Sequence, residues 1–189
     1  KNKDATSGYP AIVDYYDGSG TDQFSYVYQL NENDDHNKAR MGINEVGFGI
    51  VYTDSENLYG CTNTGINTTN PDCCYEPNAN TNGLVGSEFT AYALKTCANI
   101  EDFRLLLNET ESRRKVHQHF GVIDSNGNGS LFEVDGCTHY EIEINNETGC
   151  MANTALYHPD AGVPASGSTS NQRCERANYL LADNFANLD

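Results

Sequence analysis

The 189-residue sequence predicts an α+β domain in which strands come first, two helices follow and strands return. Apolar and polar residues alternate between residues 24 and 30 and again between 140 and 144, a pattern typical of half-buried strands. Between residues 87 and 107, apolar residues recur at helical spacing instead. Helices grouped between strands favour layers of helix on sheet over the alternation of a Rossmann-type fold.

Three strands are predicted in the N-terminal half. The first covers residues 24–30, where aromatic and leucine side chains occupy every second position. Residues 41–43 and 47–52 predict two further strands, joined by a turn at 44–47. The glycines in the second of these two strands indicate that another backbone packs closely there.

Two helices are expected next, each with a residue suited to cap its N-terminus. Ser87 precedes the first helix, and Asn99 precedes the second. The second helix carries an apolar stripe of Ile100, Phe103, Leu106 and Leu107. Such a stripe predicts that one side of the helix packs on a core.

The C-terminal half contains three more predicted strands, at residues 120–123, 130–134 and 140–144. Two stretches rich in small and polar residues, 62–83 and 160–172, predict long exposed loops. The length fits a single domain over residues 1–189.

The charge balance bears on possible partners. The chain has a formal net charge of -16, with eleven Lys and Arg in total, which argues against nucleic acid as a partner. The run Arg113–Lys115 is expected to be a solvated helix end. No apolar run approaches the roughly 20 residues that a membrane-spanning helix needs.

The chain is rich in cysteine, and the spacing does not resemble a zinc site. Disulfides in an oxidising compartment explain this usage better. Because the number is odd, one cysteine is either free or paired with a segment outside this sequence. The seven disulfide candidates are Cys61, Cys73, Cys74, Cys97, Cys137, Cys150 and Cys174.

Four N-x-[ST] sequons lie in polar segments. Together with the cysteines they predict an extracellular, secreted and N-glycosylated protein. The acceptor residues are Asn67, Asn108, Asn128 and Asn146.

The segment from Asp124 to Asp135 has two interpretations. Oxygen-bearing side chains at Asp124, Asn126 and Asn128, with a carboxylate at Asp135, follow the spacing of a calcium-binding EF-hand loop. An EF-hand needs helices on both sides, however, and the flanking sequence predicts strands. A glycine-rich β-hairpin turn is the favoured interpretation, and a calcium loop is the alternative.

The five histidines are expected to be surface or structural residues. His117 and His119 would share a strand face, but no third metal ligand can be identified. We therefore predict no metal centre outside the calcium alternative, and the sequence implies no cofactor.

Five blocks resemble the acyl-coenzyme A:6-aminopenicillanic-acid acyltransferase family, which includes carcinine hydrolase-like proteins. They occur in the family's order and extend over nearly the whole chain except the two long loops. The blocks are Lys1–Asp4, Met41–Ile50, Gly86–Leu107, His119–Asp124 with Leu131–Glu133, and Tyr179–Phe185. Members of this family are N-terminal-nucleophile (Ntn) hydrolases.

The resemblance implies an αββα sandwich and an N-terminal cysteine exposed by self-cleavage. That cysteine would attack a linear amide, with its own α-amine as the general base, and pass the acyl group to water or an amine. Asp4 matches a carboxylate near the nucleophile, and Asn184 matches a plausible donor to the oxyanion.

The sequence also departs from the family pattern. The family's nucleophile lies a short hairpin before the block that begins at Lys1, and the basic residue before its Asn-Phe pair is replaced here by Ala182-Asp183. We therefore expect a partial Ntn fold whose nucleophile lies on a missing chain segment. The alternatives are an inactive extracellular structural glycoprotein that self-associates into a filament, coat or other oligomer, and a calcium-stabilised binding module.

Overall fold

A computed structural model shows one antiparallel sheet of seven strands, whose spatial order follows the chain order from β1 to β7. The strands are β1 (Ala11–Tyr16), β2 (Tyr26–Asn31), β3 (Met41–Asn44), β4 (Gly49–Asp54), β5 (Gln118–Ile123), β6 (Gly129–Val134) and β7 (His139–Glu143). The structure describes residues 11–21, 23–32, 34–35, 37–55, 58, 84–111, 114, 116–144, 172–173, 176–177 and 179.

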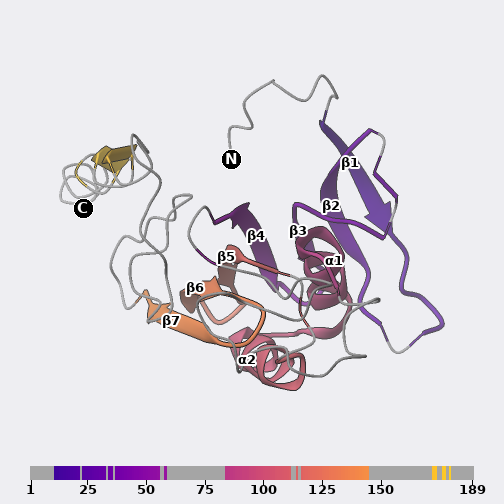
Figure 1. The fold of residues 1–189 in the computed structure, drawn as a ribbon. Coiled ribbons are helices and arrows are strands. Elements are labelled where there is room, and N and C mark those ends of the chain that lie inside the picture. The colour runs from indigo at the N-terminus through magenta and orange to yellow at the C-terminus, as the bar shows by residue number, and fades with distance from the viewer. Residues whose placement is uncertain are drawn as a thin grey trace, which may run out of the picture.

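Two helices, α1 (Gly86–Thr96) and α2 (Ile100–Glu109), connect β4 to β5 and pack on one face of the sheet (Figure 1). Phenylalanines fill the space between the layers. The Phe89 ring of α1 lies 5.5 Å from that of Phe120, and the Phe103 ring of α2 lies 5.1 Å from that of Phe132. All four side chains are fully buried. Each contributes about 1.5–3 kcal/mol through the apolar surface it removes from water.

The described elements confirm the α+β class and the predicted order of strands, helices and strands. Predicted strand and helix positions agree with the structure to within a few residues. The predicted loop at 62–83 lies outside the described residues, as does 160–172 except for Gln172. Within the described residues, no helix is long and apolar enough to cross a membrane.

Strand β1 was not predicted from the sequence. It is an edge strand in which Val13 is 76% exposed and Tyr15 is 57% exposed, while Ile12 packs against the core. Apolar side chains therefore occur on both of its faces. The segment therefore lacks the alternation of apolar and polar residues by which a half-buried strand is predicted from sequence.

Asn99 caps α2 as predicted, because its side-chain oxygen accepts a hydrogen bond from the Asp102 backbone N–H at 3.0 Å. The predicted cap at Ser87 is wrong, since α1 begins one residue earlier, at Gly86. Gly86 lies against the Gln118 side chain, where an added Cβ would clash at 1.7 Å.

Arg114 corrects the prediction of a solvated basic run. Its side chain is 1% exposed, and its guanidinium donates hydrogen bonds to the backbone oxygens of Leu107, Asp135 and Thr138. Burial lowers its pKa to about 10. The residue joins the end of α2 to the β6–β7 turn, a contact between segments far apart in sequence.

Candidate functional site at the polar end of the sheet

The sheet face that points away from the helices is apolar over much of its area. Strand register aligns neighbouring side chains in rows across this face, one of which runs through Val27, Ile43, Gly49 and Ile123. Three of these residues are large and open to solvent: Val27 is 45% exposed, Ile43 is 50% exposed and Ile123 is 57% exposed. A groove of about 640 Å³ runs over this part of the sheet, which we call the open face.

The end of the same face is polar and buried. Register places His119 of β5 directly between Thr53 of β4 and Glu133 of β6. The His119 Nδ1 atom lies 3.9 Å from Glu133 Oε1, and the two side chains are only 2% and 6% exposed. The open face thus ends in a buried imidazole–carboxylate pair. Apolar side chains on this face are exposed while polar ones are buried, which reverses the usual distribution.

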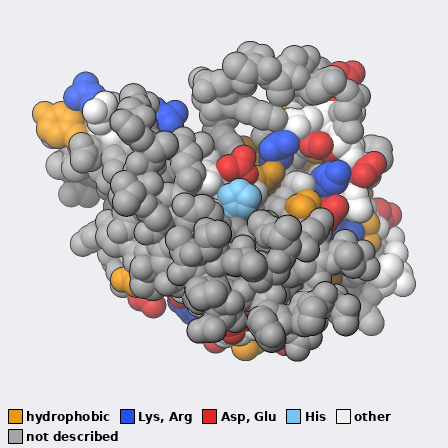
Figure 2. Space-filling view, in the orientation of Figure 1, with side chains coloured by type: hydrophobic (Ala, Val, Ile, Leu, Met, Phe, Trp, Pro, Cys, Tyr) orange, Lys and Arg blue, Asp and Glu red, His pale blue; other side chains and the backbone are white. Residues whose placement is uncertain are grey.

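Polar side chains also gather on the helix-facing side of this end. Gln118 donates from Nε2 to Asp54 Oδ1 at 2.9 Å, and Arg40 donates from Nη1 to the Tyr52 hydroxyl at 3.1 Å. Burial raises the pKa of Tyr52, which the neighbouring Arg40 charge only partly offsets. Figure 2 shows acidic, basic and histidine side chains close together on one face of the molecule.

An imidazole close to a carboxylate is a combination of groups that can take part in proton transfer. His119 and Glu133 are therefore the residues in the described part of the chain best placed for proton transfer. The same described residues contain no group of three His, Cys, Asp or Glu side chains that could hold a metal ion.

The sequence pattern predicts His119 to be a surface or structural histidine and gives no link between it and Glu133. The signal that could have found the pair is the register of β5 against β6, in which the two residues are direct partners. The predicted supporting residues Asp4 and Asn184 lie outside the described residues, so their roles stay predictions.

The calcium-loop alternative is wrong for Asp124, Asn126, Asn128 and Asp135. Residues 124–128 form the hairpin turn between β5 and β6, as favoured above, and Gly127 has a φ of 82°. Asp135 follows β6 and lies at its opposite end, six residues or about 20 Å away along a strand. It accepts hydrogen bonds from the backbone N–H groups of Cys137 and Thr138 instead.

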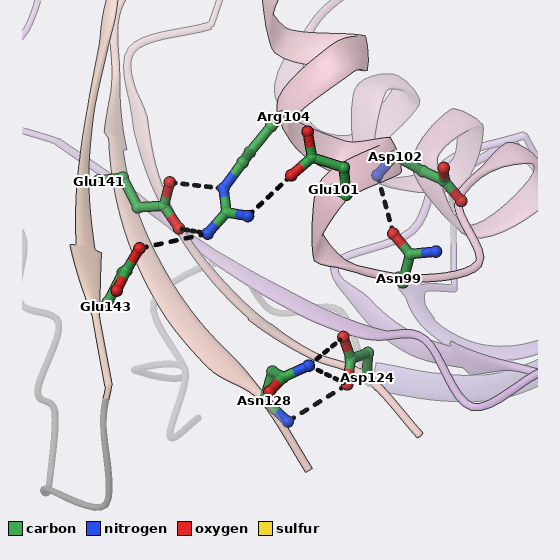
Figure 3. Close-up of polar contacts among 8 residues, drawn as sticks. All are labelled: Asn99, Glu101, Asp102, Arg104, Asp124, Asn128, Glu141 and Glu143. Carbon is green, nitrogen blue, oxygen red and sulfur yellow. Dashed lines mark hydrogen bonds and ion pairs between the residues drawn. The ribbon is translucent and has the colours of Figure 1, made fainter. Parts of the chain in front are cut away.

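The Asp124 carboxylate organises the turn. Its Oδ1 atom accepts backbone hydrogen bonds from Asn126 and Asn128, and the Asn128 side chain donates to both carboxylate oxygens at 3.2 and 3.1 Å (Figure 3). Burial opposes ionisation, but these hydrogen bonds and one from the Ile100 backbone hold the pKa of Asp124 below its ordinary value. The turn is thereby attached to the start of α2.

Beside this turn lies a polar cavity of about 600 Å³ between α2 and β7. Arg104 forms a two-point contact with Glu141, with distances of 2.8 and 2.7 Å, and a further ion pair with Glu101 at 2.9 Å. Glu143 lies 3.6 Å from the same guanidinium (Figure 3). Three carboxylates around one arginine leave the wall of the cavity with excess negative charge.

Two of the seven cysteines lie in the described part of the chain. Cys97 is a buried free thiol, so it leaves the set of disulfide candidates. Its side chain is 1% exposed within the core. Cys137 is disulfide-bonded. Cys61, Cys73, Cys74, Cys150 and Cys174 lie outside the described residues, and the pairing pattern stays a prediction.

Two of the four sequons can be placed. Asn108 is exposed near the end of α2, and Asn128 is exposed in the β5–β6 turn. Asn67 and Asn146 lie outside the described residues.

The chain has only low-scoring structural similarity to the known proteins described below. No protein-family model and no curated protein matches the chain. The structure is similar to penicillin V acylase from Agrobacterium tumefaciens, with a TM-score of 0.44 and 17% identity over 64% of this chain and 33% of that chain.

The structure is also similar to two variants of conjugated bile acid hydrolase from Clostridium perfringens. Their TM-scores are 0.45 and 0.41, with 14% and 15% identity, and each match covers 65% of this chain and 36% of the other. The chain thus spans about a third of the length of these structures. At these scores the likeness assigns neither a family nor an activity.

Proposed function

We propose that this chain forms part of an N-terminal-nucleophile amide hydrolase or acyltransferase that acts on a linear amide C–N bond. The proposal rests on one observation: three of the sequence blocks that resemble the family lie in the strands and helices that form the framework of the domain. Residues 41–50 cover β3 and the start of β4, residues 86–107 cover α1 and most of α2, and residues 119–124 with 131–133 lie in the β5–β6 hairpin. These are the elements that pack around the phenylalanine core.

The proposed reaction begins with attack of an N-terminal thiolate on the substrate carbonyl, after the terminal amine takes up the thiol proton. The C–N bond then breaks, the amine leaves with a proton, and the acyl-enzyme passes its acyl group to water or to another amine. The family resemblance places the nucleophile before the block that begins at Lys1, with Asp4 and Asn184 in supporting roles. The complete αββα sandwich would place a second sheet on the open face.

We place His119 and Glu133 at this site as a proton-transfer pair, because they lie buried at the polar end of the face that the second sheet would cover. A His119→Gln variant keeps a polar side chain of similar size but cannot titrate. We expect it to alter the pH profile of amide hydrolysis while circular dichroism stays unchanged. A pH profile identical to that of the unmodified protein would remove the pair from the mechanism.

The proposal is tested on the polypeptide as isolated from its source. An electrophilic acylating reagent should label one N-terminal residue, identified by mass spectrometry as Cys, Ser or Thr at a processed terminus. Amide substrates should be hydrolysed, and labelling should abolish the hydrolysis. An N-terminus without such a residue, or hydrolysis that persists after complete labelling, would contradict the proposal.

A second candidate is an extracellular structural glycoprotein that associates with copies of itself. The open face favours it, because Val13, Val27, Ile43 and Ile123 are large, apolar and exposed in a chain of net charge -16. Two acidic copies repel each other least where their surfaces carry no charge, and an apolar patch of this kind marks an interaction surface.

Self-association is checked by sedimentation of the natural protein against an Ile43→Asp variant. If the open face joins copies, the variant should sediment as a monomer. Leu105→Asp is the matched control, because Leu105 is similarly exposed, at 52%, but lies on α2. A monomeric natural protein would exclude the structural candidate, and disruption by the control alone would place the interface elsewhere.

A further inference from the structure

Two sequons in the described part of the chain have different surroundings. Asn108 is exposed on α2, three residues after the exposed Leu105, and does not line the polar cavity beside the 124–128 turn. Asn128 instead lines the polar cavity between α2, the 124–128 turn and β7. A glycan on Asn108 would extend into solvent, whereas a glycan on Asn128 would begin at the mouth of this cavity.

The lining of the cavity suits a sugar with an N-acetyl group. Glu101, Arg104 and Glu143 supply hydrogen-bond acceptors and donors for hydroxyl and amide groups. Ile100 and Ile144 supply apolar contacts in the same wall. Its volume of about 600 Å³ leaves room for a hexosamine ring.

The Asn128 amide is already oriented for such a linkage. Its Nδ2 atom donates to both oxygens of one carboxylate, that of Asp124. A single N–H can serve both contacts, because the two acceptors lie side by side on the same group. The other hydrogen is the one that an N-linked sugar replaces, so the contact with Asp124 can persist after modification.

We propose that this cavity binds the first sugar of an N-linked glycan carried by Asn128. The inference rests on the proposed glycoprotein character of the chain. In the modification, a lipid-pyrophosphate-linked oligosaccharide loses its C1–O bond, and C1 becomes bonded to Asn128 Nδ2. The proton displaced from Nδ2 leaves with the lipid pyrophosphate. Because Ser130 of the sequon is 2% exposed, this step precedes formation of the β5–β6 hairpin.

Site-resolved digestion with peptide-N-glycosidase tests the inference on secreted protein. From native protein, the enzyme should release the glycan of Asn108 and leave that of Asn128, and after denaturation it should release both. Equal rates of native release would overturn the inference. So would an unoccupied Asn128 beside an occupied Asn108, although the glycoprotein proposal would survive that result. If neither site is occupied, both proposals fail.

A variant separates binding in the cavity from simple steric protection by the turn. Glu101→Ala removes one wall residue whose side chain is 66% exposed and leaves the 124–128 turn intact. Native release from Asn128 should become about fivefold faster, the effect of losing one ordinary hydrogen bond. Release from Asn108 is the internal control and should not change. An unchanged rate at Asn128 would contradict the role of the cavity.

Discussion

Buried polar side chains connect distant segments of this protein by bonding to backbone groups. Arg114 donates to Leu107 at the end of α2 and to Asp135 and Thr138 beyond β6. Burial removes the guanidinium charge from water, and the acceptors in these three hydrogen bonds are backbone carbonyl groups, not carboxylates. Hydrogen bonds to carbonyl oxygens compensate for that loss of hydration.

Replacing Arg114 by Met should lower the free energy of unfolding by about 3–5 kcal/mol, because several buried carbonyl groups would lose their donor. Urea unfolding followed by circular dichroism measures the change. Lys38→Met is the control, since Lys38 forms a surface ion pair with the exposed Asp35, and its loss should change stability by less than about 0.5 kcal/mol. Similar effects for both variants would contradict the structural role of Arg114.

Cys97 should be unreactive in the folded protein. Burial raises the pKa of its thiol to about 12, so almost no thiolate is present at pH 8. We expect a thiol-specific reagent to leave Cys97 unmodified in the native state and to label it in denaturant. Peptide mapping of the labelled protein gives the answer, and rapid native labelling would show that the side chain is accessible.

At the scale of elements, Asn44 fixes the β3–β4 turn to the end of α1. Its Nδ2 atom donates to the backbone oxygens of Leu94 at 3.0 Å and Cys97 at 2.7 Å. Its Oδ1 atom accepts from the Phe48 backbone N–H at 2.9 Å. One side chain thus satisfies two carbonyl groups near a helix end and closes the adjacent turn.

Asn44→Ala should destabilise the protein by about 2–3 kcal/mol, because three buried backbone groups lose their partner. Asn44→Asp should cost more at pH 7, since a carboxylate would face two carbonyl oxygens. Its deficit should shrink at acid pH, where a protonated Asp can donate once. Urea unfolding at both pH values distinguishes the variants, with Asn37→Ala at an exposed position as the control. An Asp variant as stable as the natural protein would contradict the assigned donor direction.

The 124–128 turn gives a prediction of pH dependence. Because the pKa of Asp124 is lowered in the folded state, the native protein holds fewer protons on this group than the unfolded chain does. Its stabilising effect is therefore present above about pH 4 and is lost as the pH falls through the lowered value.

Asp124→Asn should reduce stability at pH 7 by about 1.5–3 kcal/mol, the range for a hydrogen bond to a charged group. It should also flatten the loss of stability between about pH 5 and pH 2. Unfolding curves across this range test both effects. An unchanged acid slope in the variant would show that other carboxyl groups, such as Glu141, dominate the acid response.

At the scale of the whole molecule, the two faces of the sheet differ in what covers them. One face is closed by α1 and α2 around a core of phenylalanines, and the other exposes Val27, Ile43 and Ile123. Both proposed functions assign a partner to the open face, either a second sheet or a copy of the chain. The oligomeric state of the isolated protein therefore bears directly on its function.

Much of the framework could be predicted from sequence because it depends on local periodicity. The alternation in β2 and the apolar stripe of α2 arise from the geometry of strands and helices, and Asn99 caps its helix by a contact three residues away. The edge strand β1 was missed because apolar residues lie on both of its faces.

The candidate site depends on contacts that no local pattern contains. His119 and Glu133 meet because β5 pairs with β6 in one register, and a shift by one residue would turn one of them to the other face. Sequence by itself determined the α+β class, the helix pair and the hairpin turn at 124–128. Only the tertiary structure decided that Arg114 and Cys97 are buried, that Asp124 and Asp135 lie apart, and that one sheet face stays open. The physical reason is that burial and strand register follow from packing between distant segments, whereas helix and strand periodicity follow from neighbours along the chain.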